Sequence, residues 1–328
     1  ADLVPDSVTA ARCWVLCGEA SAFSQPELPL ALRYLERADQ VLLKQLEKAP
    51  QRPDALKVRS ELLLMLGMTE AKFQRLDEAE GHLRQLIGDG PLAAQVTAEN
   101  RLGALLALSQ ILAQPVATDE SEKLRQAAWA LGISEEVSAP VALHALYTSL
   151  PLPVRDSVSR FTPPPLPDRI VTPSRAESLG NLWNCQRFQG LPEWFQIGDE
   201  LASDHFFHEP RQSADFEIVV RQLLATMPRV LGALPADSME RSQLESIYAS
   251  NLLLATQSAQ ERGDQSEVAR LSQRFETTFH GRDVQFIAPR ERPAQRLVRI
   301  GEIYRGTMLG HVEQLKQMQG GSRAPQPR

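Results

Sequence analysis

The most informative segment of the sequence runs from Ser60 to Ala93 and reads SELLLMLGMTEAKFQRLDEAEGHLRQLIGDGPLA. Small residues recur in it at a fixed interval, because Gly67 is followed after twelve residues by Ala79, and Ala79 after twelve more by Pro91. Apolar residues at spacings of three and four predict two helices, and the glycine and alanine let these helices cross closely. Proline ends the second helix because it lacks a backbone N–H.

This spacing resembles the tetratricopeptide repeat, a pair of antiparallel helices of about 34 residues. The resemblance extends less faithfully over about residues 11–115. In the upstream repeat, Gly18 stands at the glycine position if one residue is inserted between the two helices. In the downstream repeat, Gly103 stands at the glycine position but is two residues out of register with the period of about 34 residues. Residues 245–280 resemble the repeat more weakly, because Thr256 stands at the glycine position. The alternative is a non-repeating helical bundle with the same apolar stripes.

One helix pair cannot bury its apolar face, so the resemblance implies stacked pairs in a curved array. In this family the first helices of the pairs form an inner, concave surface that binds peptide segments of other proteins. The inner-face residues of the best repeat would be Glu61, Leu64, Met68, Ala71 and Lys72. This set lacks the clustered Lys and Asn that family members use to clamp a C-terminal carboxylate, so that variant of the function is disfavoured.

Helical patterns continue through most of the chain. We expect helices at residues 27–48, at about 54–66, and at 76–88, 91–113, 175–189, 191–207, 212–234, 238–261, 265–279 and 293–318. Asp54, Ser134 and Asp237 are predicted to begin helices, and Gly263-Asp264 separates two of them. The only strand-like piece is residues 284–287.

Seven prolines between residues 150 and 173 divide this pattern, since proline fixes φ and removes a donor. The predicted organisation is a repeat-like helical domain (1–149), a proline-rich linker (150–173), a second helical domain (174–318) and a disordered tail (319–328). The expected fold class is therefore all-α, with a solenoid in the N-terminal half.

One short stretch has the residue types of a metal site. His205, His208 and Glu209 would lie within one helical turn and could face a cation such as Zn²⁺, which would support a metal-dependent hydrolase. The zinc-protease signature instead places its histidines four apart with the glutamate between them. The alternative interpretation is a helix end at Pro210 with the histidines at the surface and the neighbouring phenylalanines inside.

Aromatic residues are dense in residues 183–216. They form either the core of the second domain or, if Trp194 and Phe195 are exposed in their loop-like context, a partner-binding patch. Cys13 and Cys17 are four residues apart on one helical face. With no second cysteine pair to complete a tetrahedral site, we interpret them as buried structural thiols.

The net charge, the lengths of the apolar stretches and the motifs that are absent exclude several functional classes. The net charge is −6, so there is no global basic field to hold nucleic acid, although the arginines of residues 290–305 form a local basic stretch that could contact it. No stretch approaches about eighteen uninterrupted apolar residues, which excludes a membrane span. Glycine-rich phosphate loops and nucleophile motifs are absent from the sequence, and no cofactor is expected.

The leading hypothesis from the sequence is a non-enzymatic adaptor that binds a protein or peptide through a helical-repeat groove. The alternatives are the hydrolase built on His205, His208 and Glu209, and a regulatory protein that contacts nucleic acid through residues 290–305. Thiols that are unpaired by pattern favour the cytoplasm. A leader removed before Ala1 would reverse that assignment.

Overall fold

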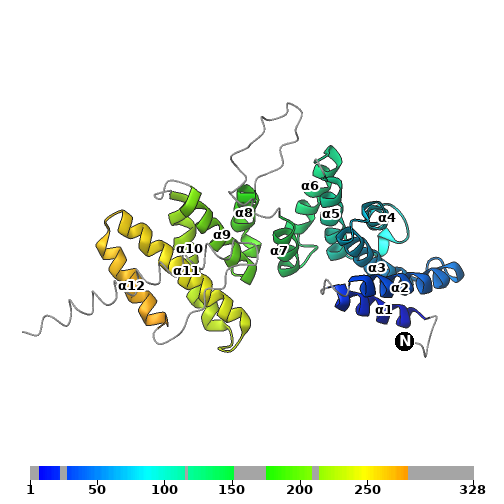
Figure 1. The fold of residues 1–328 in the computed structure, drawn as a ribbon, viewed down its shortest axis with the longest axis horizontal. Coiled ribbons are helices and arrows are strands. Elements are labelled where there is room, and N and C mark those ends of the chain that lie inside the picture. Colours follow the sequence, from blue (N-terminus) through cyan, green and yellow to red (C-terminus); the bar gives the residue numbers. More distant parts are fainter. Residues whose placement is uncertain (1–6, 23–27, 115–116, 151–174, 209–213, 280–328) are drawn as a thin grey trace, which may run out of the picture. The chain divides into compact units, whose positions relative to one another are not determined.

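The computed structural model describes residues 7–22, 28–114, 117–150, 175–208 and 214–279. Within these residues all regular structure is helical, and twelve α-helices follow one another along the chain. The helices divide into two compact units, one holding α1–α7 and the other α8–α12 (Figure 1). The predicted proline-rich linker, strand-like piece, last helix and tail lie outside the described residues, apart from Leu150, which is buried.

The first unit packs each helix against the next one in the sequence. Its elements are α1 (Val8–Ala22), α2 (Leu28–Lys48), α3 (Pro53–Lys72), α4 (Leu76–Ile87), the short 3₁₀ helix η2 (Ala93–Gln95), α5 (Ala98–Leu112), α6 (Asp119–Ile133) and α7 (Ala139–Thr148). Contacts also join alternate helices, α1 with α3, α3 with α5, and α5 with α7. As a result α3 contacts α1, α2, α4 and α5.

Three helix starts differ from the sequence prediction. The helix expected at 91–113 begins only at Ala98, because the side chain of Thr97 accepts the backbone N–H of Asn100 and so caps it. Ser134 ends α6 instead of beginning a helix: its hydroxyl bonds the carbonyl oxygen of Leu131. Asp54 lies inside the first turn of α3, where Pro53 occupies the first helical position, and pairs with Arg52.

Glycines mark the points where consecutive helices cross most closely. A Cβ atom added to Gly67 of α3 would lie 2.6 Å from the Leu83 side chain of α4, and one added to Gly18 of α1 would lie 2.7 Å from Leu35 of α2. The separation along the chain is one residue longer in the second pair, which matches the insertion inferred from the sequence. Each leucine occupies the space that a larger residue would need.

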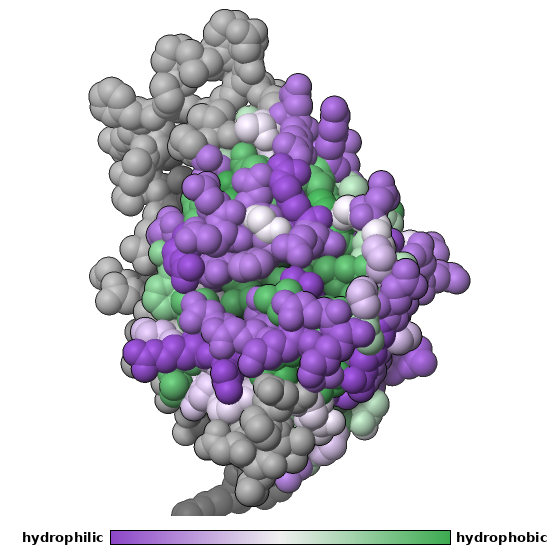
Figure 2. All heavy atoms as spheres, turned by 90° about the vertical axis from the view of Figure 1, so that its right-hand side faces the viewer, coloured by the Kyte–Doolittle hydropathy of each residue, from purple (hydrophilic) through white to green (hydrophobic). Residues whose placement is uncertain are grey.

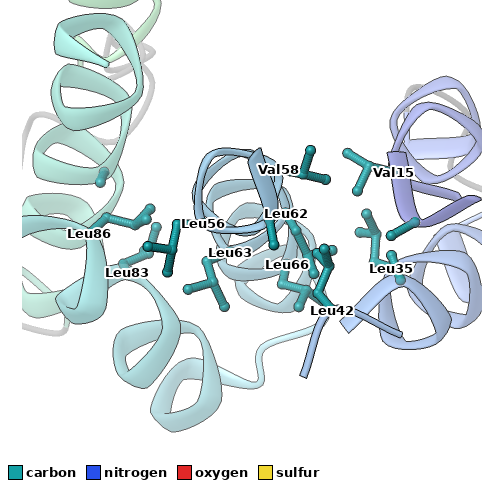
Figure 3. Packing of buried hydrophobic residues seen from close by; sticks show 14 of the residues in the cluster. Val15, Leu35, Leu42, Leu56, Val58, Leu62, Leu63, Leu66, Leu83 and Leu86 are labelled. Carbon is teal, nitrogen blue, oxygen red and sulfur yellow. The ribbon is translucent and has the colours of Figure 1, made fainter. Parts of the chain in front are cut away.

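The core of the first unit is built around α3, which is apolar on two sides. Figure 3 shows Leu62 and Leu66 on the side of α1 and α2, whereas Leu56 and Leu63 lie toward α4. All four leucines are at most 6% exposed. A helix buried on two sides cannot show the simple one-sided stripe of a surface helix, and it needs neighbours on both sides to be stable.

A buried carboxylate fixes the turn between α3 and α4. The Glu70 side chain is only 4% exposed, and its Oε2 lies 2.7 Å from Nδ1 of His82 on α4. The backbone carbonyl of Glu70 accepts the N–H of Arg75, whose guanidinium lies 3.8 Å from the Glu70 carboxylate. Gln74 between them has φ +61°, a left-handed conformation that costs a non-glycine residue energy. These contacts hold the end of α3 against α4.

The second unit repeats the sequential packing. Its elements are α8 (Arg175–Asn184), the 3₁₀ helix η3 (Gln186–Phe188), α9 (Pro192–His208), α10 (Ala214–Ala233), α11 (Met239–Glu261) and α12 (Gln265–Phe279). Each helix contacts the next, and α9 also contacts α11. The helix predicted at 175–189 ends early, at Asn184. The next start signal acts one residue later than expected, because Ser238 and not Asp237 accepts the N–H of Arg241.

Candidate functional site

The side chains predicted for an inner face lie along one stripe of α3. Met68 and Lys72 are exposed, whereas Glu61, Leu64 and Ala71 are half-buried. Their spacing of three and four residues places them on the same side of the helix. The helices α1, α2, α4 and α5 contact α3, and the stripe holds the exposed side chains of the C-terminal half of this helix, Met68 and Lys72.

The neighbouring helices fix the two ends of the stripe. Toward α5, Leu64 packs at van der Waals distance from Gly103, where a Cβ atom would lie 3.3 Å from the leucine side chain. Toward α1, the Nζ of Lys72 donates to the backbone carbonyl of Ala22 at 3.3 Å. The absence of a side chain on Gly103 therefore leaves Leu64 partly accessible, and Lys72 has one end tied to the last residue of α1.

Large exposed apolar side chains also occur on α1 and at the end of α3. Met68 is 43% exposed, Phe73 at the end of α3 is 36% exposed, and Leu16 of α1 is 56% exposed. Figure 2 shows that hydrophilic residues cover most of the face turned to the viewer, with strips of hydrophobic residues between them. Single exposed apolar residues are normal, but several on adjacent helices are typical of interaction surfaces.

Of the two alternatives for the aromatic residues of the second unit, the structure shows the core and not an exposed patch. Trp194 is 1% and Phe195 0% exposed, so both belong to the core. Trp194 stacks on Trp183 with ring centroids 3.9 Å apart, and its indole N–H donates to the Trp183 carbonyl. The loop-like signals at Gly190 and Pro192 mark the start of α9, and the aromatic side chains that follow turn inward.

The histidine stretch falls only partly within the described residues. His205 lies in the last turns of α9 and is half-buried, and His208 ends that helix. Glu209 lies outside the described residues, as do the arginines of 290–305. Among the residues that the structure describes, no group of three His, Cys, Asp or Glu side chains is arranged to hold a metal ion.

The cysteine interpretation is also corrected. Cys13 and Cys17 are both exposed on α1 and are free thiols, not buried structural ones. The residues of α1 that reach the core of the unit are Ala11, Val15 and Gly18, on the opposite side of the helix.

Sequence reasoning missed a cleft of about 280 Å³ in the second unit. Its walls come from α10, α11 and α12, and its apolar lining includes Val220, Leu224 and Leu271, all nearly fully buried. Four arginines and two glutamates also line it: Arg221, Arg262, Arg270, Arg274, Glu217 and Glu267. Positive side chains therefore outnumber negative ones around an apolar floor.

A proline in α10 positions one of these arginines. Pro228 lies inside the helix and has no N–H, so the carbonyl of Leu224, four residues earlier, loses its usual helical donor. The Nη2 of Arg274, on α12, donates to this carbonyl at 2.5 Å, and its Nε donates to the hydroxyl of Tyr248 on α11 at 2.6 Å. Arg274 thus links three helices at the cleft.

The other arginines of the cleft have carboxylate partners. Arg262 pairs with Glu217 at 2.5 Å, and Arg270 pairs with Glu267 through two hydrogen bonds of 2.6 and 2.7 Å. The Arg270 guanidinium lowers the pKa of Glu267 below its ordinary value. Arg221 is 83% exposed and lies 3.8 Å from Glu217. In the described part of the chain, no carboxylate lies within 4 Å of the Arg274 guanidinium, which distinguishes Arg274 from the other three.

A proline within a long helix was the one sequence signal that could have indicated this cleft. It shows that a carbonyl near Leu224 is freed, but it does not show which donor fills the gap, because Arg274 lies 50 residues away.

Comparison with known proteins finds no significant match to any protein-family model, curated protein or solved structure. Within the described ranges, no helix is both long and apolar enough to cross a bilayer.

Proposed function

We propose that this chain is a non-enzymatic adaptor whose first unit stacks tetratricopeptide-like helix pairs and binds a peptide segment of another protein along α3. The observation that supports the proposal is the arrangement of the helices that contact α3. The helices α1, α2, α4 and α5 contact α3, Met68 and Lys72 of the stripe stay exposed, and contacts between alternate helices put α1, α3 and α5 side by side. Side-by-side first helices are the arrangement that gives repeat arrays their continuous binding surface.

The chemistry of the stripe favours a peptide with apolar anchors and mixed charge. Met68 is flexible and polarisable, which suits it to varied apolar partners. Glu61 and Lys72 stand on either side of it with opposite charges, so a bound segment gains from complementary charges at both ends. An anchor of this kind, surrounded by polar residues, is typical of interfaces in which a few residues supply most of the binding free energy.

The test is affinity capture with the tagged full-length chain, comparing Met68→Glu with Met239→Glu. Met239, at the start of α11, is 78% exposed, so its substitution adds the same charge in the same residue type away from the stripe. We expect Met68→Glu to weaken capture of the partners at least tenfold, because a carboxylate would be desolvated against an apolar anchor. Capture unchanged by Met68→Glu, or reduced equally by both substitutions, would contradict the proposal.

A further inference from the structure

The arginine-lined cleft between α10, α11 and α12 has the features of a binding site for an anion. Arg274 is held by hydrogen bonds to Tyr248 and Leu224, and its guanidinium also lies 5.4 Å from the centre of the Tyr248 ring. A guanidinium has five N–H donors, and these two bonds use one on Nε and one on Nη2. The remaining donors of Arg274 have no partner among the described residues, and the group is already fixed in place.

The apolar part of the cleft suits a ligand with a hydrocarbon stem. Val220, Leu224 and Leu271 are at most 6% exposed and lie beside the arginines. The volume of about 280 Å³ falls just below the usual range of pockets that enclose whole small molecules, about 300–1,000 Å³. A single side chain with its main chain outside fits this volume better than a cofactor does.

The glutamates of the cleft favour a ligand with one negative charge over a ligand with two. Glu217 and Glu267 line the same cleft and each already neutralises an arginine. Arg274 is therefore the cleft arginine with no carboxylate within 4 Å among the described residues, and a single carboxylate balances it in a forked pair.

We propose that this cleft binds an acidic side chain, glutamate or aspartate, from an extended segment of a partner protein. The carboxylate pairs with Arg274 at the base, the methylene stem lies on the apolar floor, and Arg221 and Arg270 attract the segment at the rim. This surface belongs to the second unit and is separate from the α3 stripe. The proposal shares with the proposed function only the premise that the partner is a protein.

The experiment measures fluorescence anisotropy of a fluorescein-labelled octapeptide containing two glutamates, with the same peptide carrying glutamines as the comparison. The full chain is tested as wild type, as the double variant Arg221→Gln/Arg270→Gln, and as Arg229→Gln. Arg229 is an exposed arginine on α10 that does not line the cleft, so it controls for loss of charge. Arg221 and Arg270 side chains are 83% and 58% exposed, so their replacement leaves the helix packing intact.

We expect the glutamate peptide to bind at least tenfold more tightly than the glutamine peptide. We also expect the double variant to lose at least tenfold in affinity while Arg229→Gln retains it. Equal binding of the two peptides, unchanged binding by the double variant, or an equal loss with Arg229→Gln would overturn the proposal. Binding of inorganic phosphate in place of the glutamate peptide would overturn it as well.

The Met68→Glu variant separates this proposal from the proposed function. It should bind the glutamate peptide like the wild type, whatever its effect on partner capture, because Met68 lies in the other unit. Loss of peptide binding in Met68→Glu would assign the peptide to the α3 stripe and so contradict the cleft proposal.

Discussion

Pro228 leaves a backbone carbonyl of α10 without its helical hydrogen bond, and Arg274, distant in sequence, donates to that carbonyl. Proline in a helix interior removes a hydrogen bond and costs about 3 kcal/mol or more. The carbonyl of Leu224 that it leaves without a helical donor instead accepts a charged donor, which gives a stronger bond than a neutral amide. The same bond places the guanidinium in the cleft, so a local break in α10 contributes to the proposed binding chemistry.

Replacing Arg274 by alanine should destabilise the wild type by about 1–3 kcal/mol, the usual cost of leaving a buried acceptor unsatisfied. In a Pro228→Ala background the cost should be smaller, because alanine restores the helical N–H to the Leu224 carbonyl. Urea denaturation of the wild type, both single variants and the double variant measures this coupling. If the two changes in the free energy of unfolding are additive, the contribution of Arg274 to stability does not depend on the proline.

Two glycines of the same helix pair should respond in opposite ways to alanine. At Gly67 a methyl group would lie 2.6 Å from Leu83, so Gly67→Ala should destabilise by about 1–3 kcal/mol through overpacking. At Gly81, exposed in α4, nothing lies within 4 Å of an added Cβ, so Gly81→Ala should stabilise by about 0.5–1 kcal/mol. Thermal unfolding of both variants distinguishes them. A stabilising Gly67→Ala would mean that the two helices do not cross closely at this glycine.

Among the elements, α12 depends most clearly on its first turn. Gly263 has φ +76°, which glycine adopts without strain, and it lets the chain reverse after α11. Asp264 then accepts the backbone N–H of Glu267 and the hydroxyl of Ser266, as an N-cap does. This start positions Glu267, Arg270 and Arg274 on the helix that forms one wall of the cleft.

The cap makes the stability of α12 depend on pH. The N–H of Glu267 and the hydroxyl of Ser266 lower the pKa of Asp264 below its ordinary value. Stabilisation by the charged form is therefore complete above about pH 4, the ordinary range of the carboxyl, and is lost as the pH falls through the lowered pKa.

Asp264→Ala should consequently reduce the free energy of unfolding at pH 7 more than at pH 2.5. Asp264→Asn keeps an acceptor for the helix N–H groups without a charge, so it should lose less than alanine at pH 7. Urea denaturation at the two pH values measures both effects. An equal loss for Asp264→Ala at both pH values would show that the charge of this cap contributes nothing.

At the scale of the whole molecule, the described helices form two units with separate cores. Leucines around α3 dominate the first core, and stacked tryptophans with Phe188 and Phe195 lie in the second. Each unit carries its own proposed surface, the α3 stripe in one and the arginine-lined cleft in the other. An adaptor that engages one partner at both surfaces gains overall affinity without new contacts at either place.

The helical class and most helix boundaries follow from local signals in the sequence. Periodic apolar residues, prolines and glycines act locally, which is why the helix expected at 265–279 is found at those residues. Gly67 could also be read as a crossing point, because only a small residue fits where helices meet. A local signal failed at Ser134, whose hydroxyl donates to the Leu131 carbonyl of the helix before it, while the next helix begins only at Ala139.

Long-range packing determines which side chains face solvent and which meet across helices. Trp194 is buried and Cys13 exposed because burial depends on which neighbours pack beside a helix, and helical periodicity does not specify those neighbours. The contact between Arg274 and Leu224 joins residues 50 positions apart, so no local pattern contains it. Long-range packing therefore set the chemistry of the cleft, whereas the chain's local preferences set the helices that build it.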